Sequence, residues 1–149
     1  MKRYAALATI LLLAACQDPA APPGADPFFA TKPEREEVSM SALFQGPLVV
    51  RRRCVLVGDP GQYALPVWNL GATTDRDDAG RLVVHDGSLV AVEDETFEMG
   101  GGFVAEFQPA DKVEDRRVQI ARVEDWLGYP IPERCLGPDV YGVWSVAAN

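Results

Sequence analysis

The sequence predicts a mainly β fold: a small antiparallel barrel or sandwich with one short helix. Short runs rich in β-branched residues recur at intervals of about 8–12 residues after residue 47, separated by Gly, Pro and Asp. One segment near the C-terminus has apolar residues at helical spacing instead. Roughly 100 residues with five or six strands and one helix would suit an OB-like barrel.

The first predicted strands lie on either side of three consecutive arginines. Residues 48–50 and 54–57 are β-branched runs, and Arg51-Arg52-Arg53 separates them. If this run is an edge strand, alternation places Arg52 on one face and its neighbours on the other. The arginines could dock an anionic glycan or partner. Residues 58–61 then predict a turn, and residues 63–68 the next strand, with Pro66 indicating an edge or a bulge.

The later elements follow the same logic. Asp86-Gly87 between the runs 82–84 and 89–92 predicts a hairpin. The glycines at 100–102 indicate a turn or a bulge where two backbones approach closely. Ile120, Val123 and Leu127 share one helical face. Residues 140–146 predict a final strand that closes the sheet.

The N-terminal segment has the features of a secretory signal. A basic Met1-Lys2-Arg3 precedes an apolar run over residues 4–15, which is too short to cross a bilayer. Leu13-Ala14-Ala15-Cys16 resembles the lipobox of bacterial lipoproteins. The resemblance implies cleavage before Cys16 and acylation of its thiol, which would anchor the protein in the cell envelope. Gln17 after the cysteine resembles the outer-membrane sorting signal of cells with two membranes.

These features divide the chain into three parts. Residues 1–15 form the signal peptide, residues 16–42 a lipidated cysteine with a Pro- and Ala-rich tether, and residues 43–149 the β domain. Because proline forbids regular secondary structure, we expect the tether to be semi-extended and disordered. One helical turn is expected over residues 38–44.

Net charge restricts the classes of partner. The chain holds 14 Lys and Arg against 22 Asp and Glu, a net charge of −8. Removal of the signal, which has two basic and no acidic residues, would lower it to −10. This balance argues against nucleic acid and against electrostatic adhesion to anionic lipid. The membrane is therefore expected to hold the protein through the lipid on Cys16, and the domain to face an envelope protein or a glycan.

The cysteine count predicts a disulfide. If Cys16 is lipidated, Cys54 and Cys135 remain, and outside the cytoplasm such a pair is typically oxidised. Metal ligation is the alternative, but His85 is the only histidine, and two cysteines with one histidine make a poor zinc set.

One segment has part of a calcium-loop pattern. Asp75, Asp77, Gly80 and Asp86 occupy positions 1, 3, 6 and 12 of such a loop. Ala79 at position 5 cannot ligate through its side chain, and no flanking helices are evident. A calcium-stabilised structural module is therefore one hypothesis, and no other cofactor is expected.

The domain also resembles a group of small secreted bacterial β domains of unassigned function, from about Leu43 to Trp144. The shared residues are Gly46-Pro47-Leu48, Cys54-Val55-Leu56, Leu65-Pro66-Val67-Trp68, Asp86-Gly87, Met99-Gly100-Gly101-Gly102 and Ile131-Pro132 before Cys135. That group tends to show a Trp-Pro step where this chain has Trp68-Asn69. The resemblance implies a two-cysteine β domain and no enzyme activity.

No catalytic constellation stands out. His85 is the only histidine for a triad, and no Gly-x-Ser-x-Gly motif is present. Carboxylate pairs occur at 77–78, 93–95 and 124–125, and a glycosidase-like use would need two of them across a bond. The sequence therefore predicts a non-enzymatic, lipid-anchored binding or structural module, with a small carboxylate hydrolase as the alternative.

Overall fold

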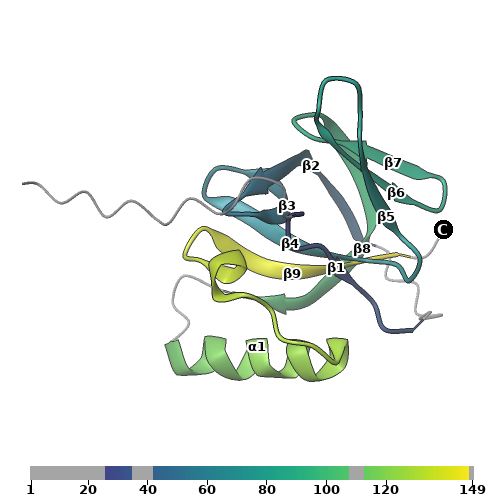
Figure 1. Cartoon of the computed structure of the whole chain (residues 1–149). Coiled ribbons are helices and arrows are strands. Elements are labelled where there is room, and N and C mark those ends of the chain that lie inside the picture. Colours follow the sequence, from purple (N-terminus) through teal and green to yellow (C-terminus); the bar gives the residue numbers. More distant parts are fainter. Residues whose placement is uncertain (1–25, 35–41, 108–112, 148–149) are drawn as a thin grey trace, which may run out of the picture.

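The computed structural model describes residues 26–34, 42–107 and 113–147 (Figure 1). The signal peptide, Cys16 and the tether up to residue 25 lie outside the described residues, as does most of the helical turn expected at 38–44. The described part is mainly β, with one α-helix, which confirms the predicted fold class.

The described elements are nine strands, one α-helix and one short 3-10 helix. In chain order they are β1 (Ala30–Thr31), β2 (Ala42–Arg51), β3 (Cys54–Asp59), β4 (Gln62–Trp68), β5 (Thr73–Arg76), β6 (Leu82–Asp86), β7 (Leu89–Val92), β8 (Thr96–Glu106), α1 (Val113–Leu127), η1 (Glu133–Leu136) and β9 (Val140–Val146). The final strand covers the predicted residues 140–146.

Five strands close into a barrel. Their order is β4-β3-β2-β8-β9, and β9 pairs back onto β4. Four of the five pairings are antiparallel, but β4 and β9 run parallel. The predicted barrel, rather than the sandwich, is therefore the architecture, and it is antiparallel apart from the β4–β9 pair. A closed ring with an odd number of strands cannot alternate direction throughout, so one pair must be parallel.

The barrel interior is filled by one residue set drawn from every barrel strand. Leu48, Val55, Ala64, Met99 and Trp144 belong to one buried cluster and come from the five different strands. Their neighbours on β3 and β4 point the other way, because successive strand residues face opposite sides. Gly101 lets β8 approach β9, since a Cβ there would lie 2.1 Å from the Ser145 carbonyl oxygen. This close approach confirms the role expected of the glycine run.

Helix α1 covers the outside of the barrel below β8 and β9 (Figure 1). Val123 and Leu127 are buried in a second cluster, and Ile120 packs against it half-buried, as the helical spacing predicts. Gly128 ends the helix with φ 77°, a left-handed value that glycine adopts without strain. No helix of the described ranges is long and apolar enough to span a membrane.

The N-terminal strand corrects the predicted length of the tether. Ala30 and Thr31 pair in parallel with Val67 and Trp68 of β4, and Phe28 forms a parallel bridge with Cys54 of β3. Strands β3 and β4 pair only near their shared turn. The N-terminal segment therefore fills the gap where they diverge, and residues 26–34 belong to the domain rather than to a tether ending at 42.

Strand β2 corrects a second boundary. Phe44 pairs with Met99 in the sheet, so the described part of the segment 38–44 is extended rather than helical. Pro47 is the last β2 residue that pairs with β8, and Leu48 is the first that pairs with β3. A proline without an N–H is tolerated at this change of partner, and the strand continues through it.

Strands β5, β6 and β7 form a separate sheet above the barrel (Figure 1). Leu82, Val84 and Ala91 join the interior cluster, so this sheet caps one end of the barrel. The predicted hairpin is confirmed: Asp86 pairs with Leu89 across a two-residue turn that begins at Gly87, with φ 60°.

Candidate functional site: an arginine depression beside the disulfide

A disulfide joins Cys54 and Cys135, as the cysteine count predicts. The two Cα atoms are 5.5 Å apart, and the residues are 81 positions apart in the chain. Cys54 is the first residue of β3, and Cys135 lies in η1; both are fully buried. The bond therefore fastens the β2–β3 turn to the segment that leads into β9.

The β2–β3 turn presents two arginines in a strained backbone. Arg51 pairs with Cys54, so Arg52 and Arg53 form a two-residue loop, with φ 49° and 61°. Positive φ at both positions is typical of a type I′ turn, which favours Asn and Gly. A non-glycine residue in this region costs on the order of 1–2 kcal/mol. The arginine run is therefore a turn and not the edge strand that alternation predicts.

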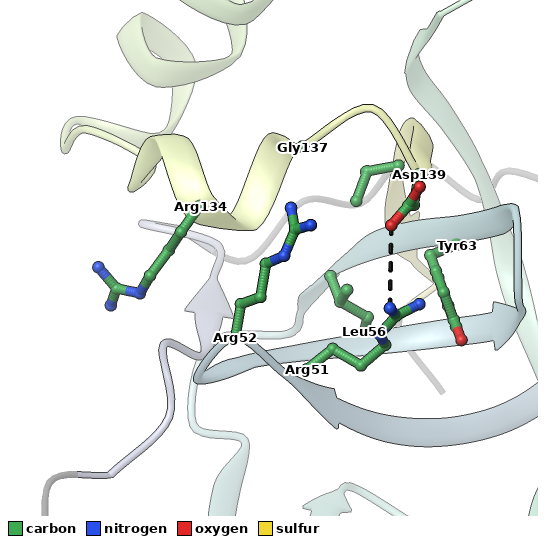
Figure 2. Close-up of a pocket in the computed structure, with 8 residues that line it drawn as sticks. Arg51, Arg52, Leu56, Tyr63, Arg134, Gly137 and Asp139 are labelled. Atoms are coloured by element: carbon green, nitrogen blue, oxygen red, sulfur yellow. Dashed lines mark ion pairs between the residues drawn. The ribbon is translucent and has the colours of Figure 1, made fainter. Parts of the chain in front are cut away.

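A shallow depression lies next to this turn (Figure 2). Its enclosed volume is about 10 Å³, room for a single water molecule, and the rest of its space is open to solvent. Residues of β2, β3, β4 and the η1–β9 segment line it: Arg51, Arg52, Leu56, Tyr63, Arg134, Gly137, Asp139 and Val140. Figure 2 shows the Arg52 side chain reaching toward Gly137, Arg51 lying beside Tyr63, and Arg134 extending outward on the far side of Arg52.

Arg51 is held by two contacts. Its guanidinium carbon lies 4.7 Å from the centre of the Tyr63 ring, and its Nη2 lies 3.9 Å from Oδ2 of Asp139. The side chains of both ion-pair partners are about 40% exposed, at 40% and 42%. Solvent screens such a pair, so Asp139 neutralises Arg51 only in part.

Arg52, Arg53 and Arg134 have no acidic partner among the described residues. Arg52 lies over the bare backbone of Gly137, where a Cβ would come within 2.5 Å of its Nη1. The guanidiniums of Arg52 and Arg134 are exposed. Arg52 and Arg134 thus line one depression without an acidic partner among the described residues, on a chain of net charge −8.

Arg116 supports the rim of the depression from α1. Its Nη2 donates to the carbonyl oxygens of Leu136, Gly137 and Val140, at 2.8, 3.1 and 2.9 Å. Its guanidinium also lies 4.3 Å from the centre of the Phe107 ring. The arginine therefore fixes the backbone turn on which Gly137 and Asp139 lie. No local sequence pattern indicates this role, because the contacts join segments about 20 residues apart.

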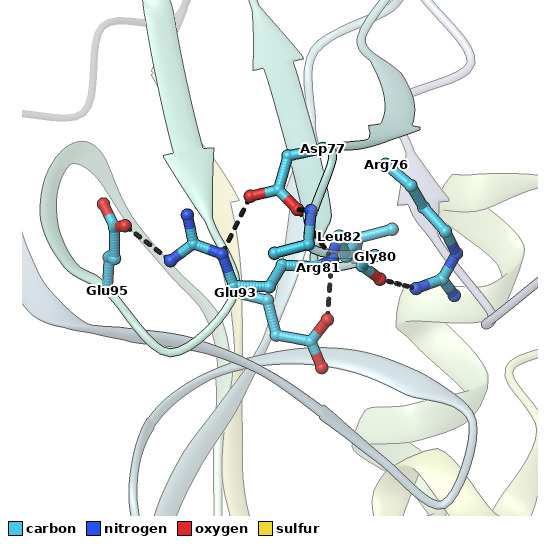
Figure 3. A network of polar contacts seen from close by, with 8 residues as sticks. Arg76, Asp77, Gly80, Arg81, Leu82, Glu93 and Glu95 are labelled. Carbon is cyan, nitrogen blue, oxygen red and sulfur yellow. Dashed lines mark hydrogen bonds and ion pairs between the residues drawn. The ribbon is translucent and has the colours of Figure 1, made fainter.

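The carboxylates of the expected calcium loop have protein partners instead. Oδ1 of Asp77 accepts from the backbone N–H of Ala79 and Arg81, at 3.0 and 2.9 Å, and Oδ2 accepts from Nε of Arg81 at 2.8 Å. Arg81 also donates to Glu95 at 2.7 Å (Figure 3). The backbone hydrogen bond from Arg81 lowers the pKa of Asp77 below its ordinary value.

Strand pairing keeps Asp75 and Asp86 apart. Asp75 pairs with Val83, and Asp86 lies three residues further along β6, about 10 Å away at ~3.3 Å per residue and on the opposite face. Among the described residues, no three His, Cys, Asp or Glu side chains form a group that could hold a metal ion. Asp75, Asp77 and Asp86 therefore do not assemble the calcium loop that their spacing suggested.

Asp86 instead belongs to a buried polar network. Nδ2 of Asn69 donates to both Asp86 carboxylate oxygens, at 3.0 and 2.9 Å, and to the Ala147 carbonyl oxygen at 3.0 Å. Nζ of Lys32 donates to Oδ1 of Asn69 at 3.2 Å and to the carbonyl oxygen of Val146. Lys32 and Asp86 are 2% and 4% exposed. The network ties the N-terminal segment, β6 and the end of β9 together.

The other candidate residues also have structural roles. Glu93 accepts from the Leu82 N–H at 2.8 Å, and Glu124 from the Ile131 N–H at 2.7 Å. His85 is exposed on β6. A groove of about 380 Å³ between α1 and η1 is lined by Glu124 and Glu133, among others. The Glu124 carboxylate already accepts the hydrogen bond from the Ile131 N–H there.

No family model matches this chain, and no curated protein or solved structure matches it either. The described residues define a small five-stranded barrel with a disulfide and an arginine-lined depression. Any function must therefore follow from the chain's own side chains.

Proposed function

We propose that this protein is a lipid-anchored module of the cell envelope that binds an anionic partner without catalysis. One observation carries the proposal: Arg52 and Arg134 line one depression without an acidic partner among the described residues, although acidic residues outnumber basic ones, 22 to 14. In an acidic protein, unpaired arginines at one place leave a cationic site for a ligand.

Two features support a location in the envelope. The lipobox Leu13-Ala14-Ala15-Cys16 would place an acylated cysteine at the start of the mature chain. The Cys54–Cys135 disulfide suits an oxidising compartment. In a cell with two membranes, Gln17 favours the outer one.

The chemistry of the depression favours a small anionic group. A guanidinium presents a planar fork of donors that matches phosphate, sulfate or carboxylate oxygens. The depression encloses only about 10 Å³, so a charged group would lie over it, between the exposed guanidiniums, while the rest of the partner stays outside. Arg51 could add a third guanidinium by leaving Asp139, because their exposed ion pair is weak.

The same depression offers little for catalysis. Its lining residues include no serine, cysteine or histidine, and Asp139 is the one carboxylate among them. A paired-carboxylate hydrolase would need a second carboxyl facing the same space. The lining therefore favours binding over hydrolysis.

Titration of the mature chain with pyrophosphate, followed by two-dimensional NMR, tests the binding proposal. We expect shifts at the backbone amides of Arg52, Gly137 and Asp139, and at least a tenfold loss of affinity in Arg52→Gln. Arg122→Gln on the exposed face of α1 is the matched control and should bind normally. Shifts scattered over the molecule, or equal binding by Arg52→Gln, would contradict the proposal.

The anchor is tested separately. Mass spectrometry of the protein extracted from its own membranes should find an acylated Cys16 at the N-terminus. A chain that begins elsewhere, or carries a free Cys16 thiol, would remove the lipid anchor and leave the anion site to be judged by titration alone.

A further inference from the structure

The N-terminal segment enters the domain beside the arginine turn. The N–H of Phe28 donates to the carbonyl oxygen of Arg53 at 2.8 Å, and the N–H of Val55 donates to the carbonyl oxygen of Phe28 at 3.0 Å. Phe28 also forms a parallel bridge with Cys54, the residue that follows the arginine turn. The segment that would lead to the lipid therefore starts at the cationic site.

We infer that the arginine turn, Arg52 and Arg53 with Arg134 beside it, binds the phosphate groups of the membrane into which the Cys16 lipid is inserted. This inference rests on the proposed lipid anchor and names the anionic partner. The turn would then orient the barrel with its arginine side on the membrane.

Chain length makes this contact possible. Twelve residues separate Cys16 from Phe28, which span at most about 43 Å at ~3.6 Å per residue. A proline-rich segment at ~3.1 Å per residue would span about 37 Å, and a relaxed one less. The arginine turn is one hydrogen bond from the end of this segment, so it cannot move far from the bilayer. A tether this short gives the turn a high effective concentration at the headgroups.

The distribution of charge supports the same orientation. Whole-chain charge argues against adhesion to anionic lipid, yet Arg52, Arg53 and Arg134 lie together at the disulfide. Arg76, Arg117 and Arg122 also have no acidic partner among the described residues, but they lie on β5 and α1. Asp75 and Asp78 are exposed in the separate sheet and its loop, and among the described residues Asp139 is the acidic residue that lines the depression. Near an anionic surface each arginine raises affinity about fivefold, so local charge outweighs the net charge within a Debye length.

Vesicle binding by the unacylated mature chain, Cys16→Ser, tests the inference. The vesicles are pure phosphatidylcholine, or phosphatidylcholine with one third phosphatidylglycerol, at low ionic strength. We expect at least about tenfold stronger co-sedimentation with the anionic vesicles, lost at high salt. The triple variant Arg52→Gln, Arg53→Gln and Arg134→Gln should lose this preference, whereas Arg117→Gln with Arg122→Gln on α1 should keep it.

The outcomes separate the two proposals. Equal binding to both vesicle types, or a preference that survives in the triple variant, overturns the membrane contact. Binding of pyrophosphate at the depression without any preference for anionic vesicles also overturns it, and leaves the proposed anionic partner to be a soluble or glycan-linked phosphate. A free Cys16 thiol in the native protein overturns the anchor and, with it, this inference.

Discussion

Two polar regions of this barrel share strand β4 and are built in opposite ways. Tyr63, near the start of the strand, lines the arginine depression. Asn69, just after its end, joins Lys32 to Asp86 in the buried network. In the network each named polar group meets a partner, and Lys32 and Asp86 are buried. In the depression Arg52 and Arg134 face solvent without an acidic partner among the described residues.

The difference separates polar groups that hold the fold from those left for a ligand. A buried lysine and aspartate are tolerated only when hydrogen bonds replace their lost water, so Lys32 and Asp86 are committed to structure. An exposed arginine has no such requirement and keeps its charge available. The strained Arg52-Arg53 turn adds to the contrast, since strain of this kind tends to persist where it serves a function.

Removal of the disulfide, which holds the β2–β3 turn to η1, should cause the largest loss of stability. For a loop closed over 81 residues, the chain-entropy model gives up to about 4.5 kcal/mol of lost stability in Cys54→Ala with Cys135→Ala. Urea unfolding of this variant measures the loss, and Cys16→Ser, which lies outside the bond, is the control. Unchanged stability would show that η1 and the β2–β3 turn hold together without it.

Removal of the Asp86 carboxylate from the buried network should cause a smaller loss of stability. Asp86→Ala leaves the side-chain amide of Asn69 short of a buried acceptor, which should cost about 2–3 kcal/mol. Thermal or urea unfolding gives the value. Asp125→Ala on the exposed side of α1 should change stability by less than about 0.5 kcal/mol. Equal effects of the two substitutions would argue against a structural role for the network.

Replacement of the two arginines of the β2–β3 turn should stabilise the fold and abolish anion binding. Arg52→Asn with Arg53→Gly supplies the residues that a type I′ turn prefers and should stabilise the fold by about 1–2 kcal/mol, while pyrophosphate binding is lost. Arg52→Gln, which keeps the strain, should lose binding without gaining stability. A double variant that is less stable than the natural chain would mean that the arginines stabilise the turn.

The smallest effect on stability is expected at Asp77. Its carboxylate is paired with Arg81, in contrast to Arg52 and Arg134 of the depression. Hydrogen bonds from Arg81 lower the pKa of this carboxyl in the folded state. Its contribution to stability is therefore present above the ordinary aspartate pKa near 4 and lost as the pH falls through the lowered value. Asp77→Asn should flatten the fall of the melting temperature below about pH 4, and Asp78→Asn should follow the natural chain. Parallel curves for all three proteins would contradict this assignment.

The sequence predicted the elements whose signals are local. The hairpin around Gly87, the apolar face of α1 and the strand at 140–146 each depend on residues within one short window. The disulfide was also accessible, because only two cysteines remain once Cys16 is assigned to the lipid. Residues 26–34 were misjudged, because their prolines describe a free segment while their strand forms only against the open edges of β3 and β4.

The acidic balance, the mainly β class and the cysteine pair were determined by the sequence alone, since each depends on composition or on spacing along the chain; the lipobox stays a prediction, because it lies outside the described residues. The arginine depression was decided only by tertiary structure. Arg52 and Arg134 are separated by about 80 residues, and barrel closure with the disulfide brings them together. The run of three arginines was visible from the start, but its meaning depends on the turn that holds it and on which of the arginines is paired with Asp139, and both are consequences of folding.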